Sequence, residues 1–384
     1  MTYTLHCGDN LAYLRTMASD SVDSVVTDPP YELGFMGKKW DASGIAHSVE
    51  LWAEVLRVLK PGGRMLAFAG TRTYHRMTCA IEDAGFEVTD MVNWVFGSGF
   101  PKSLDISKAL DKAAGAEREV VSTGAPVKRM IPGADQDRTG SWLKDDGREF
   151  VPSITAPATD AARQWEGWGT ALKPAHEPIC LARKPLIGTY AENAQAHGTG
   201  GLNIDGCRVA HVTVGGGSLA LNPHLRAHIG GGNGGHVFGA ETERREGVPS
   251  PLGRFPANLI HDGSDLGLGE AARFFYSSKA SRSDRGEGNT HATVKPTDLM
   301  RYLCRLVTPP GGIVLDPFNG SGSTGKAAVL EGFRYLGLEL SPEYVAISRA
   351  RIDAALPAPV GWSPPGCRTV AACTWPACAC GANA

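Results

Sequence analysis

The chain has 384 residues, is 42% hydrophobic and carries a formal net charge of -2. This length allows one elaborated domain or two, and no apolar run approaches the roughly 18 residues of a membrane helix. No secretory signal is expected from the N-terminal residues, and nine cysteines, an odd number, suit reduced thiols in a cytoplasmic protein. A net charge this close to zero predicts neither a membrane-surface binder nor a strongly basic nucleic-acid binder, and it does not exclude binding to nucleic acid, because local charged patches matter more than the total.

The first hundred residues predict alternating strands and helices, which indicates a largely parallel sheet with helices on both faces. Strands are expected at 3–8, 22–26, 64–70 and 86–96. Helices are expected at 9–17, 49–59 and 74–84. The Lys60-Pro61-Gly62-Gly63 sequence is expected to end the second helix.

After residue 97 the segments become short and rich in Pro, Gly, Ser and Thr. A core strand is expected at 176–185, whereas the glycine-rich stretch 215–239 is loop-like. Helix and strand order returns near residue 300, and the end of the chain predicts a loose tail. The resulting division is 1–100, 101–285, 286–355 and 356–384.

The strand at 22–26 leads directly into Asp28-Pro29-Pro30-Tyr31. Valines favour a strand, and the two prolines end its hydrogen-bonded ladder. Asp28 is therefore expected at the carboxyl end of a parallel strand, where open α/β sheets place their chemistry. For this tetrapeptide taken by itself, an ordinary turn is the alternative, because Pro-Pro commonly ends strands.

Residues 313–339 predict a strand, a glycine loop, a helix and a second strand that ends at Glu339. Gly320 and Gly322 allow close approach of the backbone to a ligand, and the helix offers free N–H groups to an anion. Glu339 is suited to binding two ribose hydroxyls. The pattern indicates a nucleoside cofactor, with a simple tight turn as the alternative. It is not a P-loop, because Ala327 stands where Ser or Thr is needed.

Together, the two motifs resemble those of amino-directed DNA methyltransferases, which methylate adenine N6 or cytosine N4 with S-adenosylmethionine. The catalytic motif precedes the cofactor motif, as in the circularly permuted beta class. The resemblance covers most of residues 1–352 and includes four further segments, 6–14, 54–65, 291–303 and 337–352. It implies an α/β fold, a Rossmann-like class I methyltransferase sheet, circularly permuted, with a large irregular inserted recognition region. Ser323-Thr324 departs from the two threonines that the family often has.

The resemblance implies that Asp28, Pro29, Pro30 and Tyr31 are catalytic. An exocyclic amino group is a poor nucleophile, and two acceptors, the Asp28 carboxylate and the Pro29 carbonyl, would aim its lone pair at the methyl group. Tyr31 would stack on a base extruded from the helix. The implied cofactor-binding residues are Asp9, Lys295, Thr297, Asp316, Phe318, Gly320, Gly322, Thr324 and Glu339.

Two of these assignments have plain alternatives. Asp9 would contact the adenine of the cofactor, but it also suits a helix N-cap. Lys295 would pair with the methionine carboxylate, but a lysine before a helix is often simply solvated.

DNA contacts are predicted in two places. The loop at 34–41 mixes glycines, lysines and an aromatic side chain, which suits a loop that orders on DNA; burial of Trp40 in the core is the alternative. Sequence recognition is expected within 187–262, with a surface spacer as the alternative. The predicted DNA-binding residues are Lys38, Lys39, Trp40, Arg208 and Arg226. No metal site is assigned, because the four C-terminal cysteines lack paired spacing.

The expected function is transfer of a methyl group to adenine N6 in double-stranded DNA, by base flipping and direct transfer. Residues 1–100 would form the catalytic half of the domain, 286–355 the cofactor-binding half and 101–285 the insertion that recognises the target.

Cytosine N4 is the alternative target, although the family more often shows Ser-Pro-Pro-Tyr for it. RNA methyltransferases often carry Asn-Pro-Pro-Tyr with the opposite motif order, and a non-catalytic DNA-binding module would not need both motifs. A cytosine C5 enzyme needs a Pro-Cys pair, which the chain lacks. A restriction endonuclease partner in a restriction-modification system, or none, and a homodimer remain open.

Overall fold

The structure is a computed structural model that describes residues 2–34, 39–99, 101, 103–125, 127–128, 149–209, 253–262, 275–291 and 293–356. The chain divides into two compact units, residues 1–97 with 176–384 and residues 98–175. Within the described ranges, no helix combines the length and apolar character needed to cross a membrane.

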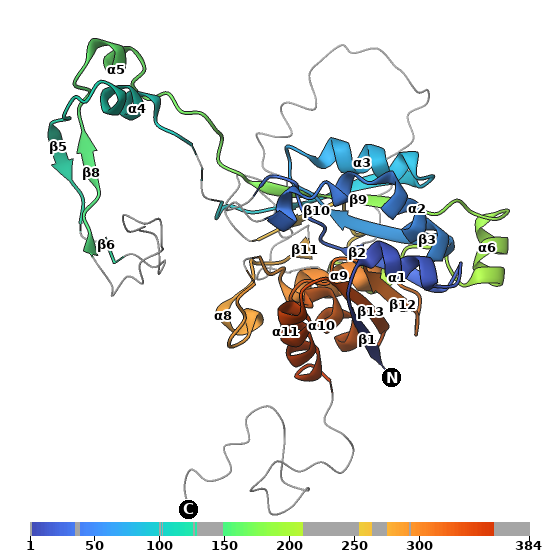
Figure 1. Cartoon of the computed structure of the whole chain (residues 1–384). Helices are drawn as coiled ribbons and strands as arrows, with labels where there is room; N and C mark the ends of the chain where they lie inside the picture. The colour runs from blue at the N-terminus through green and yellow to red at the C-terminus, as the bar shows by residue number, and fades with distance from the viewer. Residues whose placement is uncertain are drawn as a thin grey trace, which may run out of the picture. The chain divides into compact units, whose positions relative to one another are not determined.

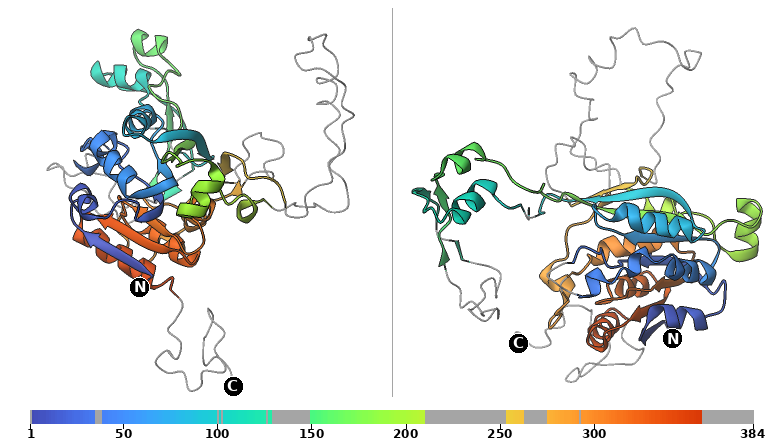
Figure 2. Two further views of the ribbon diagram at one scale, coloured as in Figure 1. Left: turned by 90° about the vertical axis from the view of Figure 1, so that its right-hand side faces the viewer. Right: turned by 45° about the horizontal axis from the view of Figure 1, so that its top comes forward.

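The first unit is built on one large sheet with helices on both sides (Figures 1 and 2). In spatial order its nine strands are β1 (Tyr3–Cys7), β13 (Arg334–Glu339), β12 (Ile313–Asp316), β2 (Val22–Thr27), β3 (Leu59–Phe68), β9 (His176–Arg183), β4 (Glu87–Val95), β10 (Leu259–His261) and β11 (Phe275–Tyr276). β9 is antiparallel to both β3 and β4. The other pairs between these described strands are parallel.

Strands from the two ends of the chain lie side by side in this sheet. β13 pairs with β1 from Tyr335 opposite Tyr3 to Glu339 opposite Cys7, and β12 pairs with β2. In Figure 1, the orange-red strands β12 and β13 accordingly lie beside the blue strands of the N-terminal segment. Because the carboxyl ends of parallel strands meet at one edge, the segments that follow β2 and β12 come together there.

Alternating side chains of the central strands supply two hydrophobic cores. Val26 and Leu66 belong to one core, and Val25 and Met65 belong to the other, because successive residues of a strand point to opposite faces. The first core is covered by α9 (Thr297–Val307), α10 (Ser323–Leu330) and α11 (Pro342–Asp353). The second is covered by α1 (Asn10–Thr16), α2 (Val49–Val58) and α3 (Tyr74–Asp83).

The helix before residues 60–63 ends within one residue of the expected place, but the expected start of the next strand at residue 64 is wrong. α2 ends at Val58, and β3 begins directly at Leu59. The turn residues are taken into the strand as an irregularity, where the β2–β3 register shifts between Val22 and Ser24 and Gly62 has φ +74°. A bulge tolerates a proline that cannot donate to the ladder.

In the second unit, residues 98–175, the described residues form two helices and two short strand pairs. They are α4 (Ile106–Ala113), α5 (Asp160–Gln164), β5 (Val120–Thr123) with β8 (Ser153–Thr155), and β6 (Val127–Lys128) with β7 (Glu149–Phe150). Burial raises the pKa of Asp111, but hydrogen bonds from Ala158, Thr159 and Arg118 lower it, to about 2. The bonds from Ala158 and Thr159 join α4 to the segment that begins α5, and the bond from Arg118 joins α4 to the segment before β5.

The remaining described helices are short connectors of the first unit. They are α6 (Tyr190–His197), α8 (Arg282–Arg285) and the 3₁₀ turns η2 (Lys39–Ala42), η3 (Ile45–His47) and η4 (Asp205–Cys207). α6 carries a capping box between Thr189 and Glu192, which satisfies free N–H groups at its start.

Candidate active site

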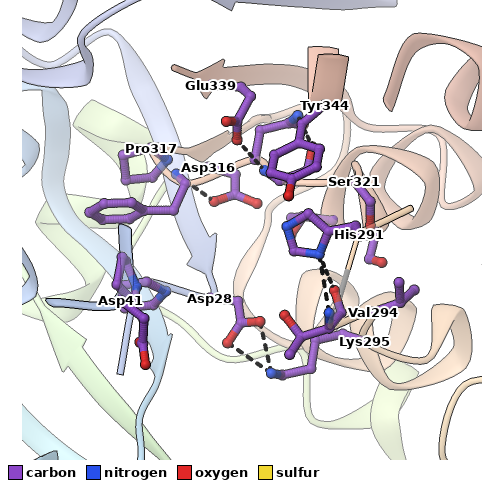
Figure 3. Close-up of a pocket in the computed structure, with 18 of the residues that line it drawn as sticks. Asp28, Asp41, His291, Val294, Lys295, Asp316, Pro317, Ser321, Glu339 and Tyr344 are labelled. Carbon is purple, nitrogen blue, oxygen red and sulfur yellow. Dashed lines mark hydrogen bonds and ion pairs between the residues drawn. The ribbon is translucent and has the colours of Figure 1, made fainter. Parts of the chain in front are cut away.

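A cavity of about 890 Å³ opens in the first unit at the carboxyl edge of the sheet. Its lining includes Asp9 after β1, Asp28 after β2, Asp316 at the end of β12 and Glu339 at the end of β13. Four acidic side chains therefore reach one cavity from four neighbouring strands. Figure 3 shows Glu339 and Asp316 on one side of it and the Asp28–Lys295 pair on the other.

The glycine loop between β12 and α10 forms one wall of the cavity. Gly320 and Gly322 have φ values of +50° and +78°, in the left-handed region that favours glycine. A Cβ atom at position 322 would lie 2.2 Å from Ser348 Oγ on α11, and one at position 320 would lie 3.1 Å from His291 Nε2. The loop therefore packs closely on both sides and presents its backbone to the cavity.

Glu339 holds this loop in place from the end of β13. Its carboxylate accepts hydrogen bonds from the N–H groups of Gly320 (2.8 Å) and Ser341 (2.9 Å). The predicted binding of ribose hydroxyls by Glu339 stays a prediction. The structure adds a tie between two loops that both line the cavity.

Glu339→Ala should weaken binding of S-adenosylmethionine by about tenfold, because it removes the predicted ribose acceptor and two charge-assisted hydrogen bonds to the loops. Isothermal titration calorimetry measures the affinity. Glu343→Ala is the matched control, since Glu343 binds Thr290 and does not line the cavity. Unchanged affinity in Glu339→Ala, with normal folding, would contradict the cofactor role of this strand end.

Asp9 follows β1, the strand that pairs with β13, and lies at the start of α1. Its carboxylate accepts a hydrogen bond from Ala12 N at 2.7 Å and so caps the helix. The same side chain lines the cavity. Capping occupies one oxygen, so the N-cap role and the predicted contact to adenine are compatible.

Asp316 is buried beneath the glycine loop. Thr27 Oγ1 (2.6 Å) and Phe318 N (3.0 Å) donate hydrogen bonds to its carboxylate. Burial raises the pKa of Asp316 to about 6, against the opposing effect of these donors. The charge of this side chain therefore changes within the pH range of ordinary assays.

Replacing Asp316 with asparagine should change how stability depends on pH. Because the folded-state pKa of about 6 lies above its ordinary value, folding favours the protonated form, and the parent loses stability as pH rises from about 4 to about 6. The variant lacks this titration. Between about pH 4 and pH 7, its free energy of unfolding should therefore rise relative to that of the parent by up to roughly 3 kcal/mol. Chemical denaturation at both pH values measures the difference. A difference between the two proteins that does not change with pH would refute the raised pKa.

Asp28 and Lys295 face each other on the opposite wall. Lys295 Nζ lies 2.8 Å from both carboxylate oxygens of Asp28 and 3.0 Å from the Tyr31 hydroxyl. It also forms an ion pair with Glu177 Oε2 at 3.2 Å. The Tyr31 hydroxyl donates to Glu177 at 2.9 Å. These four side chains form one connected cluster, called here the Asp28 cluster.

Electrostatics in the Asp28 cluster follow from burial and from its two carboxylates. Burial raises the pKa of Asp28, Lys295 lowers it and Glu177 raises it, and the net shift is upward. Burial lowers the pKa of Lys295, but Asp28 and Glu177 more than offset this, so the lysine stays protonated. Asp28 is therefore an acceptor that takes up a proton more readily than a solvent-exposed aspartate.

Most of the predicted site residues gather at this cavity. Those that line it are Asp9, Asp28, Pro29, Pro30, Tyr31, Lys295, Asp316, Phe318, Gly320, Thr324 and Glu339. Gly322 supports the loop from behind, and Thr297 donates its N–H to Asp284 at the start of α9. Lys295, predicted to pair with a cofactor carboxylate, here binds Asp28 and Glu177.

The predicted DNA contacts are only partly placed. Lys38 and Arg226 lie outside the described residues, as do the side chains of Lys39 and Trp40. Arg208 pairs with Asp205 at 2.7 Å and lies over the Phe255 ring. It does not line the cavity.

Sequence reasoning missed several residues of the cavity. Glu177 was interpreted only as part of a strand, although a charged residue before the apolar run Pro178–Ala182 is a signal that it faces something polar. His291 also lines the cavity, and its ring packs edge-on against the Tyr344 ring, with the two ring centroids 4.5 Å apart. Asp41 lines it as well and accepts hydrogen bonds from the N–H groups of Glu32 and Leu33.

Comparison with known proteins identifies both motif segments. A family model described as a DNA methylase, of the N6/N4 methyltransferase type, matches residues 22–122 and 267–350. These ranges contain Asp28-Pro29-Pro30-Tyr31 and the glycine loop. The chain is thus similar to DNA methylases in the segments that form the cavity.

Two individual proteins illustrate the extent of this similarity. The DNA adenine methyltransferase YhdJ of Escherichia coli (strain K12) is 39% identical over 69 residues, 18% of this chain and 24% of YhdJ. The Type II methyltransferase M.HindIII of Haemophilus influenzae is 24% identical over 311 residues, 79% of this chain and 69% of M.HindIII. The chain therefore matches about a quarter of the length of the first relative.

Solved structures show weaker overall agreement. M1.HpyAVI in complex with SAM has a TM-score of 0.42 at 16% identity, covering 91% of this chain and 99% of that chain. PvuII DNA methyltransferase, described as cytosine-N4-specific, has a TM-score of 0.44 at 15% identity, covering 91% of this chain and 86% of that chain.

Proposed function

We propose that this protein is an S-adenosylmethionine-dependent DNA methyltransferase that acts on an exocyclic amino group, adenine N6. One observation carries the proposal. The Asp28 carboxylate, followed by two rigid prolines, lines the same cavity as a glycine loop and the carboxylates of Asp9 and Glu339. An acceptor for an amino group and a nucleoside site thus share one space.

The cavity suits S-adenosylmethionine, which combines a nucleoside, a positive sulfonium and an amino acid. Asp9 and Glu339 lie at the ends of paired strands β1 and β13, where carboxylates suit adenine and ribose. The left-handed glycines provide a close backbone surface, and the volume of about 890 Å³ is in the range of sites that bury a whole ligand. When bound, this cofactor supplies an electrophilic methyl group and retains the electron pair of the broken carbon–sulfur bond.

The residues of the Asp28 cluster would prepare and then deprotonate the target nitrogen. Asp28 and the Pro29 carbonyl accept hydrogen bonds from the two N–H groups of the target amino group, which directs the lone pair of its nitrogen out of the ring plane. As the new carbon–nitrogen bond forms, the nitrogen becomes positively charged and then loses one proton. Asp28 is suited to receive that proton, because burial raises its pKa. In the present structure Lys295 contacts both oxygens of Asp28, so the target amino group either shares a carboxylate oxygen with the lysine or displaces the lysine from it.

Two finer assignments belong to this proposal. Adenine is favoured over cytosine because the motif begins with Asp rather than Ser. The permuted beta class is supported by the sheet order, in which β12 and β13, near the end of the chain, lie between β1 and β2. The order of the motifs along the chain, with the catalytic motif before the cofactor motif, is also that of the beta class.

Double-stranded DNA is the proposed substrate, and sequence recognition is assigned to residues 187–262. Residues 210–252 of this range lie outside the described residues. The compact unit 98–175 is the second candidate. Exchange of either segment with that of a related enzyme, followed by sequencing of the methylated product, identifies the one that changes the motif.

Methylation-aware sequencing of DNA from cells that express the protein tests the reaction. N6-methyladenine at a defined motif, present with the parent and absent with Asp28→Ala, is the expected result. N4-methylcytosine would select the alternative target. Unmodified DNA from cells that contain folded parent protein, together with no transfer to DNA in vitro, would refute the proposal.

A further inference from the structure

Glu177 is a second carboxylate on the wall of the Asp28 cluster, and it comes from a different part of the chain. It lies at the second position of β9, in register with Trp94 of β4, and lines the cavity. Its side chain is 24% exposed. A carboxylate so enclosed needs a partner, and its cationic partner is Lys295, which Asp28 already binds. Two carboxylates therefore share one ammonium.

The charge of the cluster depends on this sharing. Asp28 and Glu177 each contribute one negative charge and Lys295 one positive charge, which leaves a net charge of about -1. Tyr31 adds a neutral hydroxyl, and burial keeps its pKa well above the ordinary value. Without Glu177, the ammonium of Lys295 would neutralise the charge of Asp28. The Asp28 carboxylate would then meet the target amino group as part of an ion pair with no net charge.

We propose that Glu177 is a positioning residue of the methyl-transfer site, which holds Lys295 and so keeps a net negative charge beside Asp28. This inference rests on the proposed function. The target nitrogen becomes positive as it takes the methyl group, and a sulfonium is positive before transfer. A net negative charge on this wall stabilises both the target nitrogen and the sulfonium. Because Lys295 also pairs with Glu177, it can release an oxygen of Asp28 and still keep one ion pair.

The geometry separates the charge of Glu177 from its hydrogen bond. Its Oε2 atom accepts from the Tyr31 hydroxyl at 2.9 Å and lies 3.2 Å from Lys295 Nζ. Glu177→Gln keeps a carbonyl oxygen that can accept from Tyr31 and removes only the charge. Glu177→Asp keeps the charge on a shorter side chain. The two variants therefore distinguish an electrostatic role from a steric one.

The groups that face Asp28 also predict a change in the pH profile. Among the side chains around it, Lys295 and Glu177 act on it most strongly, and Tyr31 lowers its pKa through a hydrogen bond. His291 and Asp316 are further titratable neighbours. A like charge raises the pKa of Asp28. Its loss in Glu177→Gln should move the acid limb of kcat to lower pH, a shift that a merely structural defect would not produce.

The test compares parent, Glu177→Gln and Glu177→Asp. Glu177→Gln should lower kcat by about tenfold or more while the KM for DNA changes by less than about threefold. It should also lower affinity for S-adenosylmethionine relative to neutral S-adenosylhomocysteine by about threefold, measured by calorimetry without turnover. Glu177→Asp should keep kcat within about threefold of the parent.

Glu87→Gln is the matched control, because Glu87 forms an ion pair with Arg183 at the other end of β9 and does not line the cavity. It should leave kcat, the pH profile and the affinity ratio unchanged. Equal losses in Glu177→Gln and Glu177→Asp, or a fully active Glu177→Gln with the parent pH profile, would overturn the inference while leaving the proposed function standing. A folded parent that binds S-adenosylmethionine but transfers no methyl group to DNA would instead refute the proposed function. In that case, the affinity ratio still decides the charge role of Glu177.

Discussion

Asp28→Ala should reduce methyl transfer to DNA by roughly a thousandfold, because it removes both the acceptor that orients the target amino group and the group that takes its proton. The fold should tolerate the change, since Lys295 keeps Glu177 and Tyr31 as partners. Single-turnover transfer of a labelled methyl group measures the loss. Titration with S-adenosylhomocysteine, which lacks the positive sulfonium, should show that the cofactor site is intact.

The control for this experiment is Asp298→Ala. Asp298 is also an aspartate of the first unit, but its side chain is 81% exposed and does not line the cavity. It should retain parent activity. Near-parent turnover in Asp28→Ala would refute the assignment of Asp28 as the acceptor.

Gly322→Ala should abolish measurable binding of S-adenosylmethionine, a loss of at least about a hundredfold. The new Cβ atom would lie 2.2 Å from Ser348 Oγ on a backbone with φ +78°. A contact this short forces the loop or α11 to move, and the strained backbone adds to the cost. Ser321 and Ser323, the neighbours of Gly322, line the cavity, so this movement reaches the bound cofactor.

Gly332→Ala separates the collision from the backbone strain. Gly332 has nearly the same φ, +80°, but a Cβ atom there meets nothing within 4 Å. This variant should lose about 1 kcal/mol of stability and bind the cofactor like the parent. Thermal melting and calorimetry measure the two effects. Parent-like binding by Gly322→Ala would show that the loop is not the cofactor site.

The N-terminal strand and helix sequence could be predicted because its signals are local. Dense valines before two prolines indicate a strand that ends before Asp28, and the structure places β2 at Val22–Thr27. The expected end of α2 is also close to the observed one, at Val58. The start of β3 was misjudged, because a proline and two glycines usually indicate a turn, whereas here the sheet absorbs them at a register shift.

The sequence by itself determined which residues are chemically special. A carboxylate before two prolines, a glycine loop after a strand and an acidic strand end are each set by neighbouring residues, and they are identifiable wherever the rest of the chain goes. The sequence also showed that the segment following residue 97 differs from the preceding α/β units in its short elements and its high content of Pro, Gly, Ser and Thr. The boundary of the compact unit at residues 98–175, however, depends on which segments contact one another.

Only the tertiary structure decided which of these residues act together. Asp28, Glu177 and Lys295 are separated by more than a hundred residues along the chain, and they meet because β9 runs antiparallel between β3 and β4 while the segment before α9 reaches the same cavity. Strand order is set by the burial of both faces of the whole sheet, not by any local pattern. For that reason, the family resemblance implied Lys295 as a partner of the cofactor, whereas the fold places it between two carboxylates.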